Sequence, residues 1–112
     1  MARYHVKGKP RLDRLGELKQ RLDSGEVSLM QPFGRALEYS LRNAKMTEAG
    51  GAAVWEEEDY CSPPLAQERA AVLNRYFESI ETRRVERGEG WNEVSKLPSL
   101  WTLLAKETTA ST

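Results

Sequence analysis

The sequence predicts an α+β fold in which an antiparallel β-sheet carries two helices on one face. Residues 2–7 alternate between apolar and polar side chains, which is the period of a half-buried strand. Four leucines between residues 12 and 22 recur every three or four positions, as in an amphipathic helix. Residues 62–64 read Ser-Pro-Pro and predict the start of a second helix, because serine caps a helix and proline fits its first turn.

Tyr4 and Val6 lie on the same side of the first strand, and we expect this side to face the core. Pro10 ends this strand, because proline lacks the backbone donor that a sheet ladder needs. In the helix that follows, Gly16 lowers stability by about 1 kcal/mol relative to alanine, and we expect another backbone to pass close to it. The opposite side of the strand carries three polar residues: Arg3, His5 and Lys7.

Residues 34–61 predict a β-hairpin, with which most of the other elements pair. Its first arm alternates apolar and polar residues, a pair of glycines offers the turn, and the second arm resumes as an apolar strand. We therefore expect cross-strand pairing between residues 36–42 and 52–58. The alternative is a helix over residues 35–46, since three apolar side chains in that range also fall on one helical face.

The second half of the chain predicts a helix, a strand and a further short helix. The helix follows the Ser-Pro-Pro sequence, and residues 77–85 form an edge or half-exposed strand, rich in β-branched residues and flanked by charge. A short C-terminal helix is expected to begin near Pro98. Residues 1–107 then make one domain, and residues 108–112 make a flexible, small and polar tail.

The predicted order of elements is strand, helix, strand, strand, helix, strand and an appended helix. This succession is typical of the ferredoxin-like arrangement, also called split βαβ, with both main helices on one face of the sheet. Right-handed crossovers place the first strand in the centre, between the third and the fourth. The arrangement hosts many unrelated functions, so a function must be argued from a site.

The composition indicates a soluble domain without a strong overall charge. Of the 112 residues, 39% are hydrophobic, and 17 basic residues balance 17 acidic ones. We expect no nucleic-acid partner, because the predicted open face of the sheet lacks both stacked aromatic rings and a basic field. The start of the sequence lacks the apolar core of a signal peptide, and no apolar run approaches roughly 18 residues, which predicts a cytoplasmic protein without a membrane partner.

Charge is unevenly distributed along the chain. Residues 1–45 carry ten basic against five acidic residues, whereas residues 46–61 carry five acidic residues and no basic one. We expect these charges to meet within one fold, and the acidic run at residues 56–59 to be a solvated strand end that faces Arg83, Arg84 or Arg87. A metal site is not expected, because adjacent strand residues point to opposite faces. One cysteine and one histidine exclude a zinc cluster, and no cofactor motif is present.

One functional hypothesis places a small-molecule site on the open face of the sheet. His5 is the side chain whose ordinary pKa lies nearest neutrality, and Glu56 or Glu58 on the third strand is expected beside it. These three residues are the candidate catalytic groups of an enzyme of the proton-transfer or isomerase type. The blander alternative is that a single histidine on a strand is an ordinary surface residue.

The leading hypothesis is a self-associating protein with a binding or structural role. The open sheet face would form the interface of a homodimer, with the two sheets packed face to face and complementary charges setting their register. The apolar part of the interface is predicted to come from the C-terminal segment, although its tryptophans can equally cover their own core. The candidate interface residues are Trp91, Leu100, Trp101 and Leu104.

Overall fold

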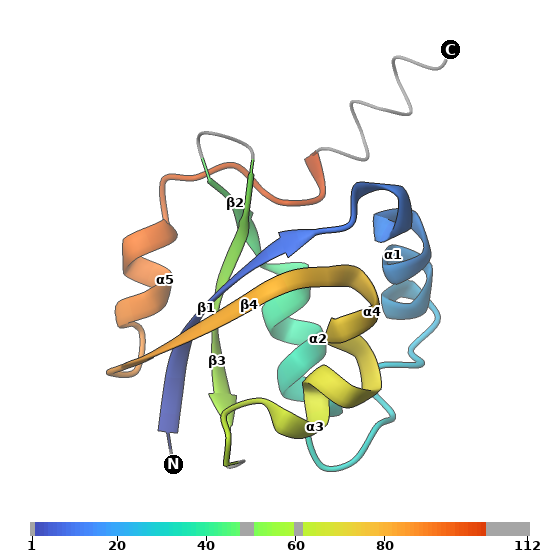
Figure 1. Ribbon diagram of the computed structural model, residues 1–112, viewed down its shortest axis with the longest axis horizontal. Coiled ribbons are helices and arrows are strands. Elements are labelled where there is room, and N and C mark those ends of the chain that lie inside the picture. Colours follow the sequence, from blue (N-terminus) through green and yellow to red (C-terminus); the bar gives the residue numbers. More distant parts are fainter. Residues whose placement is uncertain (1, 48–50, 60–61, 103–112) are drawn as a thin grey trace.

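The computed structural model describes residues 2–47, 51–59 and 62–102. They form an α+β fold around a four-stranded antiparallel sheet (Figure 1). Of the residues singled out above, Leu104 and the tail at residues 108–112 lie outside the described part of the chain.

The sheet has the strand order β2-β3-β1-β4, and each neighbouring pair is antiparallel. Its three long strands are β1 (Ala2–Pro10), β3 (Ala53–Asp59) and β4 (Phe77–Val85). In contrast, β2 (Lys45–Met46) has only two residues. β1 lies in the centre, between β3 and β4, as the sequence predicted for the first strand.

Helices flank the sheet on both sides. Three helical elements precede β2, namely η1 (Leu12–Arg14), α1 (Leu15–Asp23) and α2 (Gly34–Arg42). Between β3 and β4, three elements follow one another without a break: α3 (Ala66–Glu68), the π-helical η2 (Arg69–Leu73) and α4 (Asn74–Tyr76). A further helix, α5 (Glu89–Val94), follows β4. Figure 1 shows α1, α3 and α4 to the right of the sheet and α5 to its left.

The main core lies between the sheet and the helices from α1 to α4. Val6 and Trp55 contribute from the two central strands, and the Trp55 ring packs against Phe77 with 5.2 Å between ring centroids. Three leucines of the predicted stripe, Leu15, Leu18 and Leu22, are buried there. Gly16 has no atom within 4 Å of the position that a Cβ would take, so the close backbone expected at this glycine is absent.

The predicted hairpin arm at residues 36–42 is wrong, because these residues belong to the helix α2. The alternative of a helix was the better interpretation of the segment. Leu37 and Leu41 point into the main core from one helical face, and the Ser40 hydroxyl donates a hydrogen bond of 2.8 Å to the carbonyl oxygen of Glu56. Instead of a long arm, the two-residue strand β2 pairs with β3 on that side.

The sequence did not predict α5, which begins at Glu89. The short C-terminal helix expected to begin near Pro98 stays a prediction, because the residues after Thr102 lie outside the described part of the chain. The chain after α5 lies beside β2: the Met46 amide donates to the carbonyl of Pro98 at 2.9 Å, and the Leu100 amide donates to that of Ala44 at 2.9 Å. Within the described residues, no helix has both the length and the apolar character to cross a membrane.

Candidate functional site

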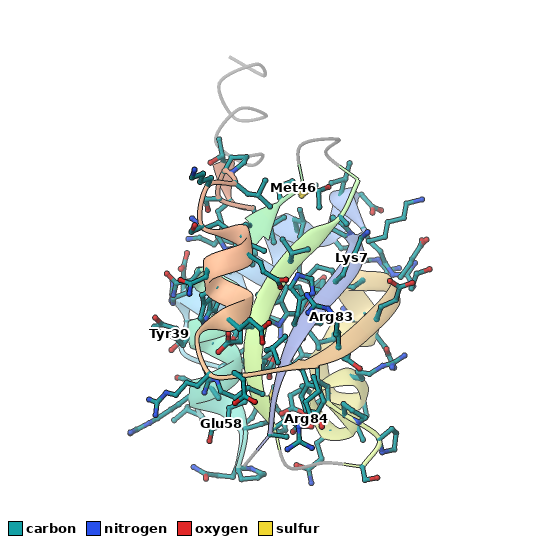
Figure 2. All side chains as sticks on the ribbon, turned by 90° about the vertical axis from the view of Figure 1, so that its left-hand side faces the viewer. Lys7, Tyr39, Met46, Glu58, Arg83 and Arg84 are labelled. Atoms are coloured by element: carbon teal, nitrogen blue, oxygen red, sulfur yellow. The ribbon has the colours of Figure 1, made fainter. Side chains whose placement is uncertain are left out.

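The sheet face opposite the main core carries the residues that sequence reasoning selected. Strand register sets His5 opposite Glu56 and Arg3 opposite Glu58 on β1 and β3. Figure 2 looks towards this face, where α5 lies over one part of the sheet and Lys7, Arg83 and Glu58 are labelled. The alternation of β1 is therefore confirmed, with Val6 fully buried on the core side and Lys7 exposed on the other.

Glu56 holds the start of α5 in place. Its Oε2 accepts hydrogen bonds from Arg3 Nε at 2.5 Å and from the Gly88 amide at 3.0 Å. Its Oε1 accepts from the amides of Gly90 at 2.8 Å and Trp91 at 3.3 Å. Burial acts to raise the pKa of this carboxyl, but the Gly88 amide and the Arg3 guanidinium outweigh it and hold the pKa below its ordinary value. Glu56 is thus ionised and holds the start of α5. Its two oxygens already accept these hydrogen bonds, so they are not available to accept a proton from His5.

The pKa of His5 lies below its ordinary value, so no neighbouring carboxylate keeps its imidazole protonated. Burial, followed by the positive charge of Arg83, lowers the pKa of its imidazole, while Glu93 acts in the opposite direction. Glu58 forms an ion pair with Arg3 at 3.0 Å. His5 lines a shallow hollow of about 250 Å³ together with Lys7, Glu81, Thr82 and Arg83. The structure brings the three predicted catalytic residues onto one face. Both carboxylates, however, form ion pairs with Arg3 rather than with His5.

The predicted interface residues belong in part to the molecule's own core. Leu100 is fully buried, so it offers no surface to a second molecule. Trp101 is partly buried, and its indole donates a hydrogen bond of 2.8 Å to the carbonyl of Leu41. Trp91 is also partly buried and packs edge to face against Tyr39, with 6.2 Å between ring centroids.

The acidic run on β3 is buried, so the prediction of a solvated strand end is wrong. Side-chain alternation turns Glu57 and Asp59 towards the helices, on the same side as Trp55. Glu57 is fully buried, and Asp59 retains only 4% of its exposure. Glu68 of α3 is 1% exposed. Repulsion links the charges of these three carboxyl groups, so they form one electrostatic cluster, which we call the carboxyl cluster.

Two donors of the described residues reach this cluster. The Trp55 indole donates to Glu57 Oε1 at 3.0 Å, and the Leu65 amide donates to Asp59 Oδ2 at 2.5 Å. The carboxyl groups of Asp59 and Glu68 share a hydrogen bond. Within the described residues, Oε2 of Glu57 and Oε2 of Glu68 have no hydrogen-bond partner, and neither side chain forms an ion pair.

Burial changes the protonation of Glu57 and Glu68. The pKa of Glu57 is raised to about 8, chiefly by burial; the Trp55 bond acts against this rise, and the charges of Glu68 and Asp59 add to it. Burial likewise raises the pKa of Glu68 to about 7, with Asp59 acting in the same direction. Near neutral pH the cluster therefore keeps Glu57 protonated, while Glu68 is poised to gain or lose its proton.

A pocket opens beside the cluster, with a volume of about 270 Å³. We call it the carboxyl pocket. It lies between α2, the end of β3 and α3, and one wall is apolar while the other is acidic. Its lining residues are Pro32, Phe33, Ala36, Glu58, Asp59, Gln67 and Glu68.

Two backbone irregularities position the acidic wall. Leu65, which is fully buried, adopts a left-handed conformation with φ 63°, rare for a residue with a branched side chain. Its amide thereby reaches Asp59. Directly after Glu68, the helix widens into the π-helical turn η2. Both kinds of irregularity are concentrated at functional sites in proteins.

Sequence reasoning missed Glu57, Asp59 and Glu68 as a functional group. The available signal was the alternation of β3, which groups Trp55 with Glu57 and Asp59, and the large apolar Trp55 ring marks that side as the core side. No sequence signal placed Glu68 beside them. Among the described residues, no group of three His, Cys, Asp or Glu side chains is arranged to hold a metal ion.

Comparison of the chain with protein-family models, with curated proteins and with solved structures found no match. The functional argument therefore stands on the geometry and charge of the residues above.

Proposed function

We propose that this protein binds a small organic molecule in the carboxyl pocket and exchanges a proton with it through Glu68. The observation that carries the proposal is the state of Glu68. Its carboxyl is 1% exposed, the residue lines a pocket, and one of its oxygens has no partner within the described residues. A buried oxygen without a partner costs stability, and a ligand that supplies the missing hydrogen bond recovers it.

The two carboxyl groups of the pocket wall suit different roles. Asp59 accepts a hydrogen bond from the Leu65 amide, which fixes the position of its carboxyl group in the wall. Glu68 shares a hydrogen bond with Asp59 and has its pKa raised to about 7, mainly by burial. A group that donates or accepts a proton in catalysis works best with a pKa near the working pH, which is the condition that Glu68 meets.

This proposal moves the proton-transfer hypothesis from His5 to Glu68. The sheet face around His5 supports it less well, because Glu56 is bonded to Arg3 and to the amides that start α5. The hollow beside His5 is also shallower than the carboxyl pocket and is lined mainly by charged residues, namely Lys7, Glu81 and Arg83.

The test is chemical-shift mapping on the ¹⁵N-labelled protein with three probes of one size: benzylamine, benzyl alcohol and sodium benzoate. We expect at least one probe to shift the amides of residues 32–36, 58–59 and 67–68. Glu68→Gln should weaken that probe's binding at least tenfold. The matched control is Glu81→Gln, an exposed glutamate on β4 that does not line the pocket. The absence of shifts at the pocket with all three probes would refute the proposal.

Self-association is a second proposal, and the aromatic surface of α2 and α5 favours it. Tyr39 is 62% exposed and packs against the partly exposed Trp91, and aromatic residues are enriched in interfaces. The strand order supports the ferredoxin-like arrangement, with α1 and α2 in the place of one helix, and dimers that pack such sheets face to face would use the side that carries α5.

Light scattering after size-exclusion chromatography tests this second proposal. We expect a mass near twice 12.7 kDa that falls towards the monomer in Tyr39→Glu. The control is Leu29→Glu, since Leu29 is also exposed, at 78%, but lies in the loop between α1 and α2. A monomer mass that does not change with concentration would contradict self-association.

A further inference from the structure

We infer that the ligand of the carboxyl pocket is a small organic cation, an ammonium group on a compact apolar body, whose binding displaces a proton from the carboxyl cluster. This inference rests on the proposed function and names the ligand class for the same pocket. Three observations support it: the sign of the pocket's charge, the unpartnered oxygen of Glu68 and the apolar wall opposite.

The pocket is acidic, and no basic residue lines it among the described residues. Asp59 and Glu68 contribute carboxyl groups, and Glu57 lies behind them in the cluster, whereas the carboxylate of Glu58 is paired with Arg3. The opposite wall, at the start of α2, contributes only uncharged residues: Pro32, Phe33 and Ala36. Buried carboxyl groups that repel one another must either bind protons or meet a positive charge, because uncompensated charge is costly away from water. An anionic ligand would find no cationic partner on these walls.

The unpartnered oxygen separates this site from a plain acidic cluster. Glu68 is 99% buried by residue area, as its relative exposure is 1%, and its Oε2 has no hydrogen-bond partner within the described residues. A carboxylate oxygen only accepts hydrogen bonds, so its natural ligand is a donor. An ammonium group brings three N–H donors and a positive charge, and it satisfies Glu68 and Asp59 together.

The apolar wall requires an organic ligand rather than a hydrated ion. Pro32, Phe33 and Ala36 form that wall, and an aromatic ring such as that of Phe33 attracts cations to its face. The volume of about 270 Å³ lies just below the roughly 300–1,000 Å³ of drug-sized pockets, which suits a compact amine.

Binding of the cation releases a proton from Glu68. At neutral pH the ligand arrives as R–NH₃⁺, and the O–H bond of the protonated Glu68 carboxyl breaks. The proton goes to the buffer, and the ammonium forms an ion pair with the new carboxylate. No electron is transferred and no other bond changes. Affinity should therefore rise with pH until Glu68 is ionised in the free protein, by roughly tenfold per unit below its pKa. A neutral ligand that accepts a hydrogen bond from protonated Glu68 would show the opposite dependence.

The experiment is calorimetric titration of the protein with benzylamine and with benzyl alcohol in phosphate at pH 6 and pH 8, repeated at pH 6 in Bis-Tris. We expect benzylamine to bind at least tenfold more tightly than the alcohol at pH 8, and to lose at least fivefold in affinity at pH 6. At pH 6, where Glu68 is mainly protonated, the apparent enthalpies in the two buffers should differ by the difference between the buffers' ionisation enthalpies for each proton released.

Variants make the inference specific to Glu68. In Glu68→Gln, whose fold is checked by its ¹⁵N spectrum, the proton release and the preference for the amine should disappear, while Glu68→Asp should keep the preference for the cation. Glu81→Gln should behave as the unmodified protein. Equal or tighter binding of benzyl alcohol or benzoate, or an affinity for benzylamine that falls as pH rises, overturns the cation inference and leaves the pocket's binding function standing. Failure of every probe to bind overturns both.

Discussion

At the scale of single residues, Glu56 and Glu57 show how one position along a strand decides the state of a carboxyl. Both are fully buried neighbours on β3. Glu56 points to the side of α5, where Arg3 and backbone amides stabilise its charge. Glu57 points into the main core, where a single indole N–H meets it and its pKa rises to about 8. Burial acts to raise the pKa of both carboxyl groups, but the partners of Glu56 outweigh it, whereas the single indole bond of Glu57 does not.

Replacement of Glu56 by alanine tests its role as an anchor. The change leaves Arg3 and the amides of Gly88 and Gly90 without their acceptor, so we expect Glu56→Ala to lower the free energy of unfolding by about 2–4 kcal/mol. The control is Glu93→Ala, which removes an exposed ion pair between α5 and Arg83 and should cost less than about 1 kcal/mol. Urea unfolding measures both, and equal costs for the two variants would contradict the anchor.

The sequence allowed these residue states to be predicted only in part. Alternation separates Glu56 and Glu58 from Glu57 and Asp59, but it does not state which set faces the helices. The partners of Glu56 lie 53 residues before it, at Arg3, and more than 30 residues after it, at Gly88 and Gly90. A charge run in a sequence therefore indicates nothing about its solvation until the segments that meet it are known.

At the scale of elements, α2 is the segment where sequence periodicity misled. Residues 37–42 alternate strictly, yet Leu37 and Leu41 are also four apart, and both periods fit such a short stretch. The helix prevails because Leu37 and Leu41 fill the main core and because its start, at Gly34, fits closely against the preceding loop. By contrast, the strands β1 and β4 were predictable, since no competing helical period runs through them.

Two glycine substitutions compare a position without room for a side chain, Gly34, with a position that has room for one, Gly16. A Cβ at Gly34 would lie 2.4 Å from the carbonyl oxygen of Val27, so we expect Gly34→Ala to lower the free energy of unfolding by more than about 2 kcal/mol. A Cβ at Gly16 would meet no atom within 4 Å, so Gly16→Ala in α1 should raise it by about 0.5–1 kcal/mol. Thermal and urea unfolding give both values, and a shift of the same sign in the two variants would refute the packing argument.

At the scale of the whole molecule, stability should be greatest in mild acid. The pKa values of Glu57 and Glu68 are raised to about 8 and about 7, chiefly by burial, so their favourable contribution is complete below the ordinary pKa of a glutamate and is lost as pH rises to about 8. The pKa of Glu56 is lowered, so its contribution is present above the ordinary value and is lost as pH falls. Both contributions to the stability, that of Glu57 and Glu68 and that of Glu56, are therefore large together only at about pH 5.

Melting temperature measured from pH 3 to pH 9 tests this balance. We expect a maximum near pH 5 and a decline towards pH 8, which Glu57→Gln should flatten because a neutral amide no longer has to lose a proton. Glu81→Gln, an exposed site on β4, should follow the curve of the unmodified protein. Parallel curves for all three proteins would show that the buried carboxyl of Glu57 does not control the decline.

The central place of β1 has a consequence for synthesis on the ribosome. Arg3 lies opposite Glu58 on one side and Val85 on the other, so the strand that leaves the exit tunnel before its neighbours lacks a full set of partners until some 80 further residues have been made. At roughly 5–20 residues per second, this delay lasts roughly 4–16 seconds. During this interval the apolar side of β1 is uncovered, and a nascent-chain chaperone that recognises short apolar segments should find its binding site there.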